Sequence, residues 1–193
     1  MNMKFYLKIS SMLVAAAFLS TLPVEAQTFR QTKQGITGTT QGMDIEIQFV
    51  SPEIVRVVKA PEGRSFTKKS LSVVKSPESM SVTTEKKGET VSLKSNAVRV
   101  DFNVETGRIS FFDKQGKALF TEKDYGAQFT PFNDAGNQTF SVRQAFLLDK
   151  NEAIYGLGQQ QVDDLNQRNH KHFMRQRALH ASVPIIQSTK GYG

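Results

Sequence analysis

The chain has 193 residues, a formal charge of +7 and no cysteine. The lack of cysteine excludes disulfide cross-links and thiol chemistry, so the fold has to be stabilised by its core. The basic residues are scattered beside turns and do not form a stripe with aromatic residues between them, which argues against a nucleic-acid partner. The length allows one generous domain or two small ones.

The first 26 residues follow the three-part pattern of a secretory signal peptide. Lys4 and Lys8 give a basic start, residues 9–22 form a mostly apolar run, and Val24 and Ala26 supply the small residues of a cleavage site. The apolar run is too short for a permanent transmembrane helix. We therefore predict cleavage after Ala26 and export from a bacterial cell as a soluble periplasmic or secreted protein without a membrane span. An uncleaved N-terminal anchor is the alternative.

Strand patterns begin shortly after this segment. Residues 27–42 are rich in Gln, Thr and Gly with little periodicity, and they are predicted to form a loose N-terminal arm. Residues 43–49 alternate apolar and polar at every step, which predicts a strand with one buried face. A turn at Pro52 separates it from a second strand over residues 54–58.

Further short apolar runs follow at intervals of about ten residues, with turn residues between them. They lie at 71–74, 80–84, 90–93, 97–102 and 108–112, and a longer strand is expected over 140–148. No stretch of helical periodicity interrupts them after the signal peptide. The pattern predicts an all-β fold, an antiparallel β-sandwich over residues 43–193.

Several kinds of catalytic or cofactor site are absent from the sequence. Gly156-Leu-Gly158 lacks the third glycine and the following helix of a phosphate-binding loop, and no nucleophile elbow is present. His170 and His172 would share a strand face, and His180 lies nearby, but a third ligand at a suitable spacing is missing. We expect no metal and no cofactor.

The adjacent carboxylates Asp163 and Asp164 do not form a catalytic pair. A retaining glycosidase needs two carboxyl groups about 5–5.5 Å apart that approach the bond from different directions. Neighbours on a strand point to opposite faces, so a turn is the expected role of this pair.

A cluster of planar polar groups between residues 158 and 176 is the remaining candidate site. Its amide and guanidinium groups suit the hydroxyls of a carbohydrate, because each hydroxyl both donates and accepts hydrogen bonds. A solvated loop explains the same composition and remains the alternative.

An ordered set of motifs in this region resembles a known family. Tyr155-Gly-Leu-Gly158-Gln-Gln is followed by Leu165-Asn-x-Arg168 and then by Val183-Pro184-x-x-x-Ser188-x-Lys190-Gly-Tyr-Gly193. Together with the run from Val98 to Lys117, these motifs are similar to the N-terminal β-sandwich domain of glycoside hydrolase family 31. The likeness extends over residues 43–193, and the subgroup is the exported α-xylosidases and α-glucosidases of Bacteroides type.

The resemblance implies a galactose-mutarotase-like sandwich that packs on a catalytic (β/α)₈ barrel in the intact enzyme. It implies hydrolysis of α-glucosides or α-xylosides with retention, and an α-linked oligosaccharide as the partner. The catalytic aspartates of the family lie on the barrel, so we expect no catalytic residue and no activity in this chain. We also expect a truncated product or a partial sequence that lacks the barrel.

The resemblance further implies that residues 159–175 form a loop at the rim of the active site. Asn166 and Arg168 are the foremost candidates for contact with the sugar, together with Gln161 and Asp163. The family often has glycine where this chain has Asn169, and because asparagine tolerates positive φ, we expect the turn to be kept.

Two other functions remain open at the level of the sequence. One is a stand-alone secreted carbohydrate-binding β-sandwich module, which would bind oligosaccharide without any further domain. The other is a β-rich interaction protein of the cell envelope, for which the polar loop would be irrelevant.

Overall fold

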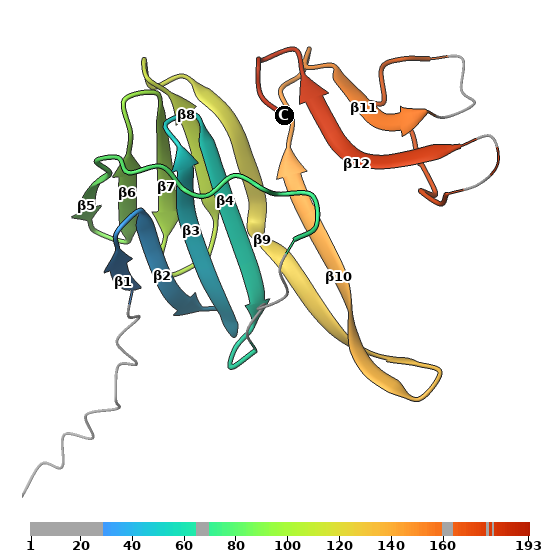
Figure 1. Cartoon of the computed structure of the whole chain (residues 1–193), viewed down its shortest axis with the longest axis horizontal. Helices are drawn as coiled ribbons and strands as arrows, with labels where there is room; N and C mark the ends of the chain where they lie inside the picture. The colour runs from blue at the N-terminus through green and yellow to red at the C-terminus, as the bar shows by residue number, and fades with distance from the viewer. Residues whose placement is uncertain (1–28, 65–69, 160–163, 177, 179) are drawn as a thin grey trace, which may run out of the picture.

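The computed structural model describes residues 29–64, 70–159, 164–176, 178 and 180–193. Within these residues it contains strands and no helix, so none that could cross a membrane (Figure 1). The all-β prediction is confirmed. The predicted signal peptide lies outside the described residues. The strands are β1 (Phe29–Thr32), β2 (Gly35–Thr40), β3 (Met43–Ser51), β4 (Ile54–Pro61), β5 (Thr83–Lys87), β6 (Thr90–Lys94), β7 (Val98–Asn103), β8 (Ile109–Asp113), β9 (Ala118–Asp134), β10 (Asn137–Leu147), β11 (Ile154–Gln159) and β12 (Ala181–Ser188).

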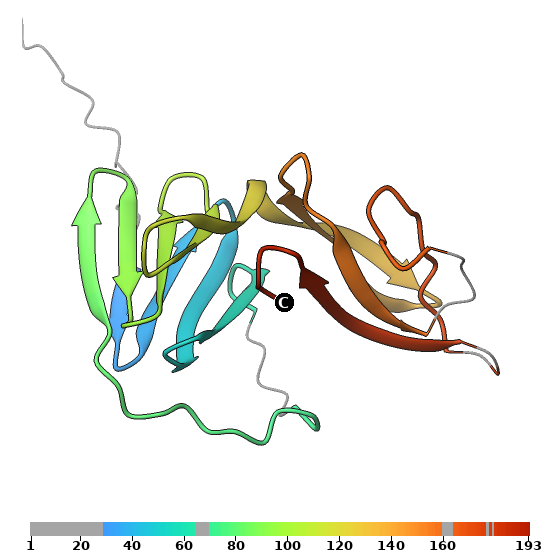
Figure 2. The same ribbon diagram turned by 90° about the horizontal axis from the view of Figure 1, so that it is seen from above.

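The strands form three antiparallel sheets in simple sequential order. The first has the order β1-β2-β3-β4, the second β10-β9-β8-β7-β6-β5, and the third pairs β11 with β12. The first two sheets face each other as a sandwich, and the β11–β12 hairpin stands to one side of it (Figures 1 and 2). The predicted β-sandwich is therefore confirmed, and the hairpin is a separate element attached to it.

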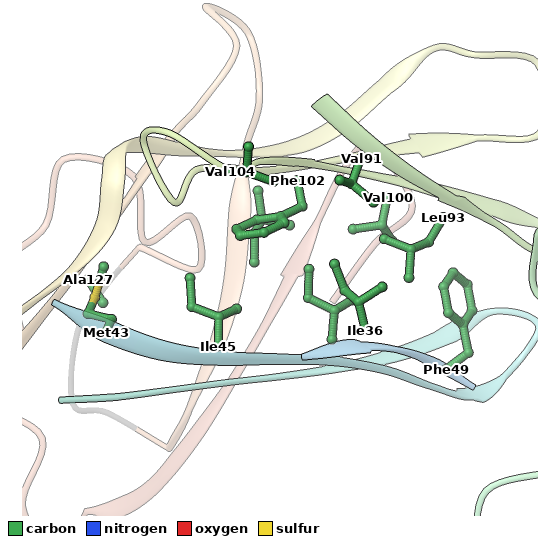
Figure 3. Packing of buried hydrophobic residues seen from close by; sticks show 12 residues of the cluster. Ile36, Met43, Ile45, Phe49, Val91, Leu93, Val100, Phe102, Val104 and Ala127 are labelled. Carbon is green, nitrogen blue, oxygen red and sulfur yellow. The ribbon is translucent and has the colours of Figure 1, made fainter. Parts of the chain in front are cut away.

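The core lies between the two larger sheets, and alternation along the strands places residues in it. In β3, Met43, Ile45, Ile47 and Phe49 are all at most 4% exposed, as their spacing predicts. The second sheet contributes the side chains that face them (Figure 3). These are Val91, Leu93, Val100, Phe102 and Ile109, each at most 1% exposed.

The predicted loose arm is wrong for its described part, residues 29–42, which form β1 and β2 and belong to the first sheet. Ile36 is 1% exposed and anchors β2 in the core, and the threonines around it favour strands. Gly35 is required where β2 approaches β3, because a Cβ atom there would lie 1.9 Å from the carbonyl oxygen of Ile47. A single buried isoleucine among polar residues does not produce a clear alternation, which is why the sequence pattern missed these strands.

The expected strand over 71–74 is not formed, and the one expected over 80–84 begins only at Thr83. The run 71–74 has the right composition, but it pairs with no strand, and Leu71 is 98% exposed. The longer strand expected over 140–148 is confirmed by β10. Its blurred alternation has a structural cause, a register shift between Gln144 and Phe146 in the pairing with β9.

A buried ion pair joins the two sheets of the sandwich. The Lys59 ammonium of β4 lies 2.6 Å from Oε2 of Glu122 in β9, and both side chains are 4% exposed. Lys59 also donates to the carbonyl oxygens of Gly107 and Tyr125. Glu122 accepts hydrogen bonds from the Ile109 amide and the Gln144 side chain. Burial lowers the pKa of Lys59, and the carboxylate of Glu122 opposes this shift.

Candidate functional site at the C-terminal hairpin

The Gly-Leu-Gly motif is part of the β11–β12 hairpin and does not form a ligand loop. Gly156 has φ +114° and Gly158 φ +83°. A Cβ atom at these positions would lie 2.3 Å from the Ile185 carbonyl oxygen and 2.0 Å from that of Ala181. The pairing with β12 shifts register between the two glycines. Both glycines are therefore needed for a bulge in a tightly paired hairpin.

The carboxylate of Glu152 ties the two ends of this hairpin together. Glu152 precedes β11 and is 3% exposed. Its Oε1 accepts hydrogen bonds from the Ser188 hydroxyl at 2.5 Å and from the Tyr192 hydroxyl, both at the far end of β12. Its Oε2 accepts one from the backbone amide of Asp149 at 2.9 Å. Lys190 reinforces the junction through an ion pair with Asp149 at 2.9 Å.

This environment keeps Glu152 ionised. Burial acts to raise its pKa, but the hydrogen bonds from Ser188, Tyr192 and the Asp149 backbone, with the charge of Lys190, outweigh burial and lower the pKa below its usual value of 4.5. The Tyr192 pKa is raised, first by burial and then by its hydrogen bond to the Glu152 carboxylate. The pair is thus a neutral phenol donating to a carboxylate.

The Glu152→Gln substitution is expected to destabilise the chain by about 1–3 kcal/mol near neutral pH, because hydrogen bonds to a charged acceptor are lost. Because folding lowers the pKa of Glu152, its ionised carboxylate stabilises the folded chain fully above pH 4.5. This stabilisation is lost as the pH falls through the pKa of Glu152 in the folded chain. The difference between wild type and variant should therefore shrink below about pH 4.5. Urea unfolding across this pH range measures it. Glu85→Gln, at an exposed position of β5, is the control, and a difference that does not change with pH would contradict the role of the Glu152 charge.

The structure brings Asn166 and Arg168 together at the base of the hairpin. Asn166 Oδ1 accepts hydrogen bonds from the backbone amides of Ile154 and Arg168, at 3.2 and 3.1 Å. The Nη1 atom of Arg168 donates to the carbonyl oxygens of Asp149 and Glu152, at 2.6 and 2.7 Å. Both residues thus hold the polar loop against the start of β11, a role that composition did not suggest. Gln161 and Asp163 lie outside the described residues.

The loop also contains Asn169 and the histidines His170 and His172. Asn169 has φ +64°, so asparagine does adopt the left-handed turn where the family often has glycine. The rings of His170 and His172 stack with centroids 6.0 Å apart, and His170 Nε2 lies 3.5 Å from a carboxylate oxygen of Asp164. Across the described part of the chain, no three His, Cys, Asp or Glu side chains gather where they could hold a metal ion.

The junction formed by Asp149, Glu152, Ser188, Lys190 and Tyr192 was not recognised in the sequence as a unit. Its members are separated by some forty positions, as in the pair of Glu152 and Tyr192. The available signal was that Ser188, Lys190 and Tyr192 lie within the second Gly-containing motif and that Asp149 and Glu152 shortly precede the first.

The comparisons with known proteins agree with this geometry. Residues 44–193 match the model of the glycosyl hydrolase 31 N-terminal galactose mutarotase-like domain. The chain belongs to glycoside hydrolase family 31. This match ends at the Gly191-Tyr192-Gly193 turn and so includes the whole Glu152 junction.

Similar members of family 31 include α-xylosidases. The chain is 29% identical over 161 residues to an α-xylosidase of Saccharolobus solfataricus, a match that covers 78% of this chain and 22% of that protein. A crystal structure of the α-xylosidase of Xanthomonas citri matches with a TM-score of 0.78 and 30% identity, over 83% of this chain and 18% of that one. A Flavobacterium johnsoniae dextranase shares the fold at a TM-score of 0.66 and 21% identity. The chain thus spans about a fifth of the length of these relatives.

Proposed function

We propose that the chain is the non-catalytic N-terminal domain of a retaining α-glycosidase that hydrolyses α-xylosides or α-glucosides. The observation that supports this most strongly is the match to the α-xylosidase of Xanthomonas citri, at 30% identity over 83% of the chain. In the proposed enzyme, this domain packs on a catalytic barrel that carries the reacting carboxylates. The signal peptide pattern supports export to the periplasm or the medium.

The polar loop over residues 159–175 is proposed to form part of the active-site rim, with Gln161, Asp163, Asn166 and Arg168 as its candidate residues. The hydrogen bonds of Asn166 and Arg168 to the hairpin backbone support a rim that is held in one orientation. A loop anchored in this way can present other polar side chains to a sugar without a large loss of conformational entropy.

A domain exchange tests the proposed function. Residues 29–193, which include β1 and β2 of the sandwich, would replace the matching domain of the Xanthomonas citri α-xylosidase, and hydrolysis of aryl α-xyloside and aryl α-glucoside would be measured. We expect turnover by the chimera, no turnover by the same enzyme without this domain, and none by the present chain alone. A folded but inactive chimera, or turnover by the chain alone, would contradict the proposal. Oligosaccharide binding by the isolated chain would favour the stand-alone module.

In the chimera, Arg168→Ala is expected to raise the KM for the aryl glycoside about tenfold, with a smaller effect on kcat, because a rim loop that is no longer anchored positions the substrate less well. Arg143→Ala is the matched control, since Arg143 is exposed on β10. Steady-state kinetics of both variants measure the effect. If the two variants had equal kinetics, the proposal that this loop is part of the active-site rim would be wrong.

A further inference from the structure

The outer edge of β4 borders an open groove. β4 is the last strand of its sheet, and within the described residues its second edge pairs with no strand. The groove along this edge has a volume of about 600 Å³ and is lined on one side by residues from Arg56 to Pro61. Its other side includes Phe129 and Phe140, whose rings meet edge to face at 6.2 Å.

The apolar side of the groove is a continuation of the core face of the larger sheet. Ala127 is 2% exposed in the core, and Phe129 and Pro131 follow it at alternate positions of β9. Val142 and Phe140 lie directly opposite them on β10. The β9–β10 arm runs past β4, the last strand of the smaller sheet (Figure 1). The smaller sheet therefore leaves part of this face uncovered, and Val142 is 60% exposed.

The chain itself carries a segment of matching chemistry between β4 and β5. Leu71, Val73 and Val74 are 98%, 59% and 92% exposed. Leu71 and Val73 flank Ser72 and Val74 comes next, in a run whose composition favours a strand, and Lys75 follows it. In the structure the segment lies apart from the sandwich (Figure 2). Apolar side chains left this exposed are unfavourable in water and gain from any available apolar cover.

The chain before and after this segment is attached to the two ends of the β3–β4 pair. β4 ends at Pro61, where it pairs with Met43, and the chain leaves it there. The chain is fixed again at Glu78, whose amide donates to the carbonyl oxygen of Val50 at 2.9 Å. Val50 lies at the opposite end of the β3–β4 pair, where Ser51 pairs with Ile54. The chain is thus anchored at both ends of the open edge, and residues 70–75 lie between these two anchor points in the sequence.

We propose that the groove along β4 is a strand-addition site and that residues 70–75 of the same chain are its occupant. The segment adds to the sheet as a fifth antiparallel strand after β1-β2-β3-β4. Leu71 and Val73 then cover Phe129 and Phe140, while Ser72 and Val74 face outward beside Val58. Attachment at both ends gives this segment a high effective concentration at the edge, which favours it over a second copy of the chain. The inference does not depend on the proposed glycosidase function.

Cysteine cross-linking tests the proposal, because the chain has no cysteine of its own. Val58→Cys would be combined in turn with cysteine at positions 71, 72, 73 and 74 of the full chain, under mild oxidation at low protein concentration. Val55 and Val57 of β4 pack against the core. Because side chains alternate along a strand, the next residue, Val58, points outward. We expect Val58→Cys to form an intramolecular disulfide with the cysteine at position 72 or 74. The disulfide yield there should be at least about fivefold higher than at positions 71 and 73, because only directly opposite residues on one face are close enough.

Thr37→Cys provides the matched control. Thr37 pairs with Glu46, and Glu46 pairs with Val58, so Thr37 lies in the same row but two strands away from the open edge. The same four partners should form little disulfide with it. Equal yields at all four positions, no disulfide with Val58→Cys, or disulfides only between two chains would each overturn the proposal. The last result would identify a second copy as the occupant.

Hydrogen exchange of the unmodified chain provides a measurement that does not depend on the cysteine variants. Amides of residues 71–75 that bond to β4 should exchange at least about tenfold more slowly than in an unstructured peptide of the same sequence. Exchange at the unstructured rate throughout this segment would overturn the proposal.

Discussion

Replacing Lys59 with methionine is expected to lower the free energy of unfolding by about 3–5 kcal/mol. The substitution leaves the Glu122 carboxylate in the interior, where it is 4% exposed, without its counter-ion. It also removes the donor that satisfies the carbonyl oxygens of Gly107 and Tyr125. Because this cluster connects β4 of one sheet to β9 of the other, its loss weakens the contact between the sheets. Urea denaturation measures the change.

Two control variants separate burial from charge in this prediction. Arg56→Met removes the exposed ion pair with Glu46, in which both side chains are about 40% exposed, and should cost less than about 1 kcal/mol. Lys59→Met combined with Glu122→Gln should recover part of the lost stability, since the amide is neutral and can still bond to the Ile109 amide. A double variant as unstable as Lys59→Met alone would contradict the unpaired charge as the cause.

The Phe102→Ala substitution is expected to destabilise the chain by about 3–5 kcal/mol, through lost burial and the cavity that remains. Phe102 lies in β7 at 1% exposure, in the middle of the layer between the two large sheets (Figure 3). Close packing allows the surrounding side chains to fill only part of the space. Thermal or urea unfolding gives the magnitude.

Phe132→Ala is the matched control, because Phe132 lies on the β9 arm at 51% exposure. This change should alter stability by less than about 1 kcal/mol. Phe102→Leu should fall between the two, since it keeps most of the apolar volume. If the two alanine variants had equal stability, the layer between the sheets could not be the principal core.

The C-terminal hairpin gives a physical meaning to the motifs on which the family resemblance rested. Gly156 and Gly158 allow the tight pairing of β11 with β12, and Ser188 and Tyr192 bind the carboxylate of Glu152. They hold the base of the polar loop, which is the part of the chain proposed to reach the sugar.

The sequence by itself determined the all-β class, most of the strands and the family. Strict alternation in residues 43–49 was sufficient to predict both the strand and its buried face, because the side-chain period of a strand is two. Turn residues between short apolar runs were sufficient to predict an antiparallel β-sandwich. The ordered motifs from Tyr155 to Gly193 were specific enough for family 31, which the match over residues 44–193 establishes.

Only the tertiary structure decided which similar patterns become strands and what the polar side chains do. Ile36 makes β2 a core strand because β3 lies beside it, whereas the more apolar run 71–74 pairs with nothing in the structure. The internal contacts of Arg168 and the buried pair of Lys59 and Glu122 depend on groups distant in sequence. The physical reason is the same in each case. Local pattern sets what a segment can bury, and only the neighbours supplied by the fold decide whether it is buried.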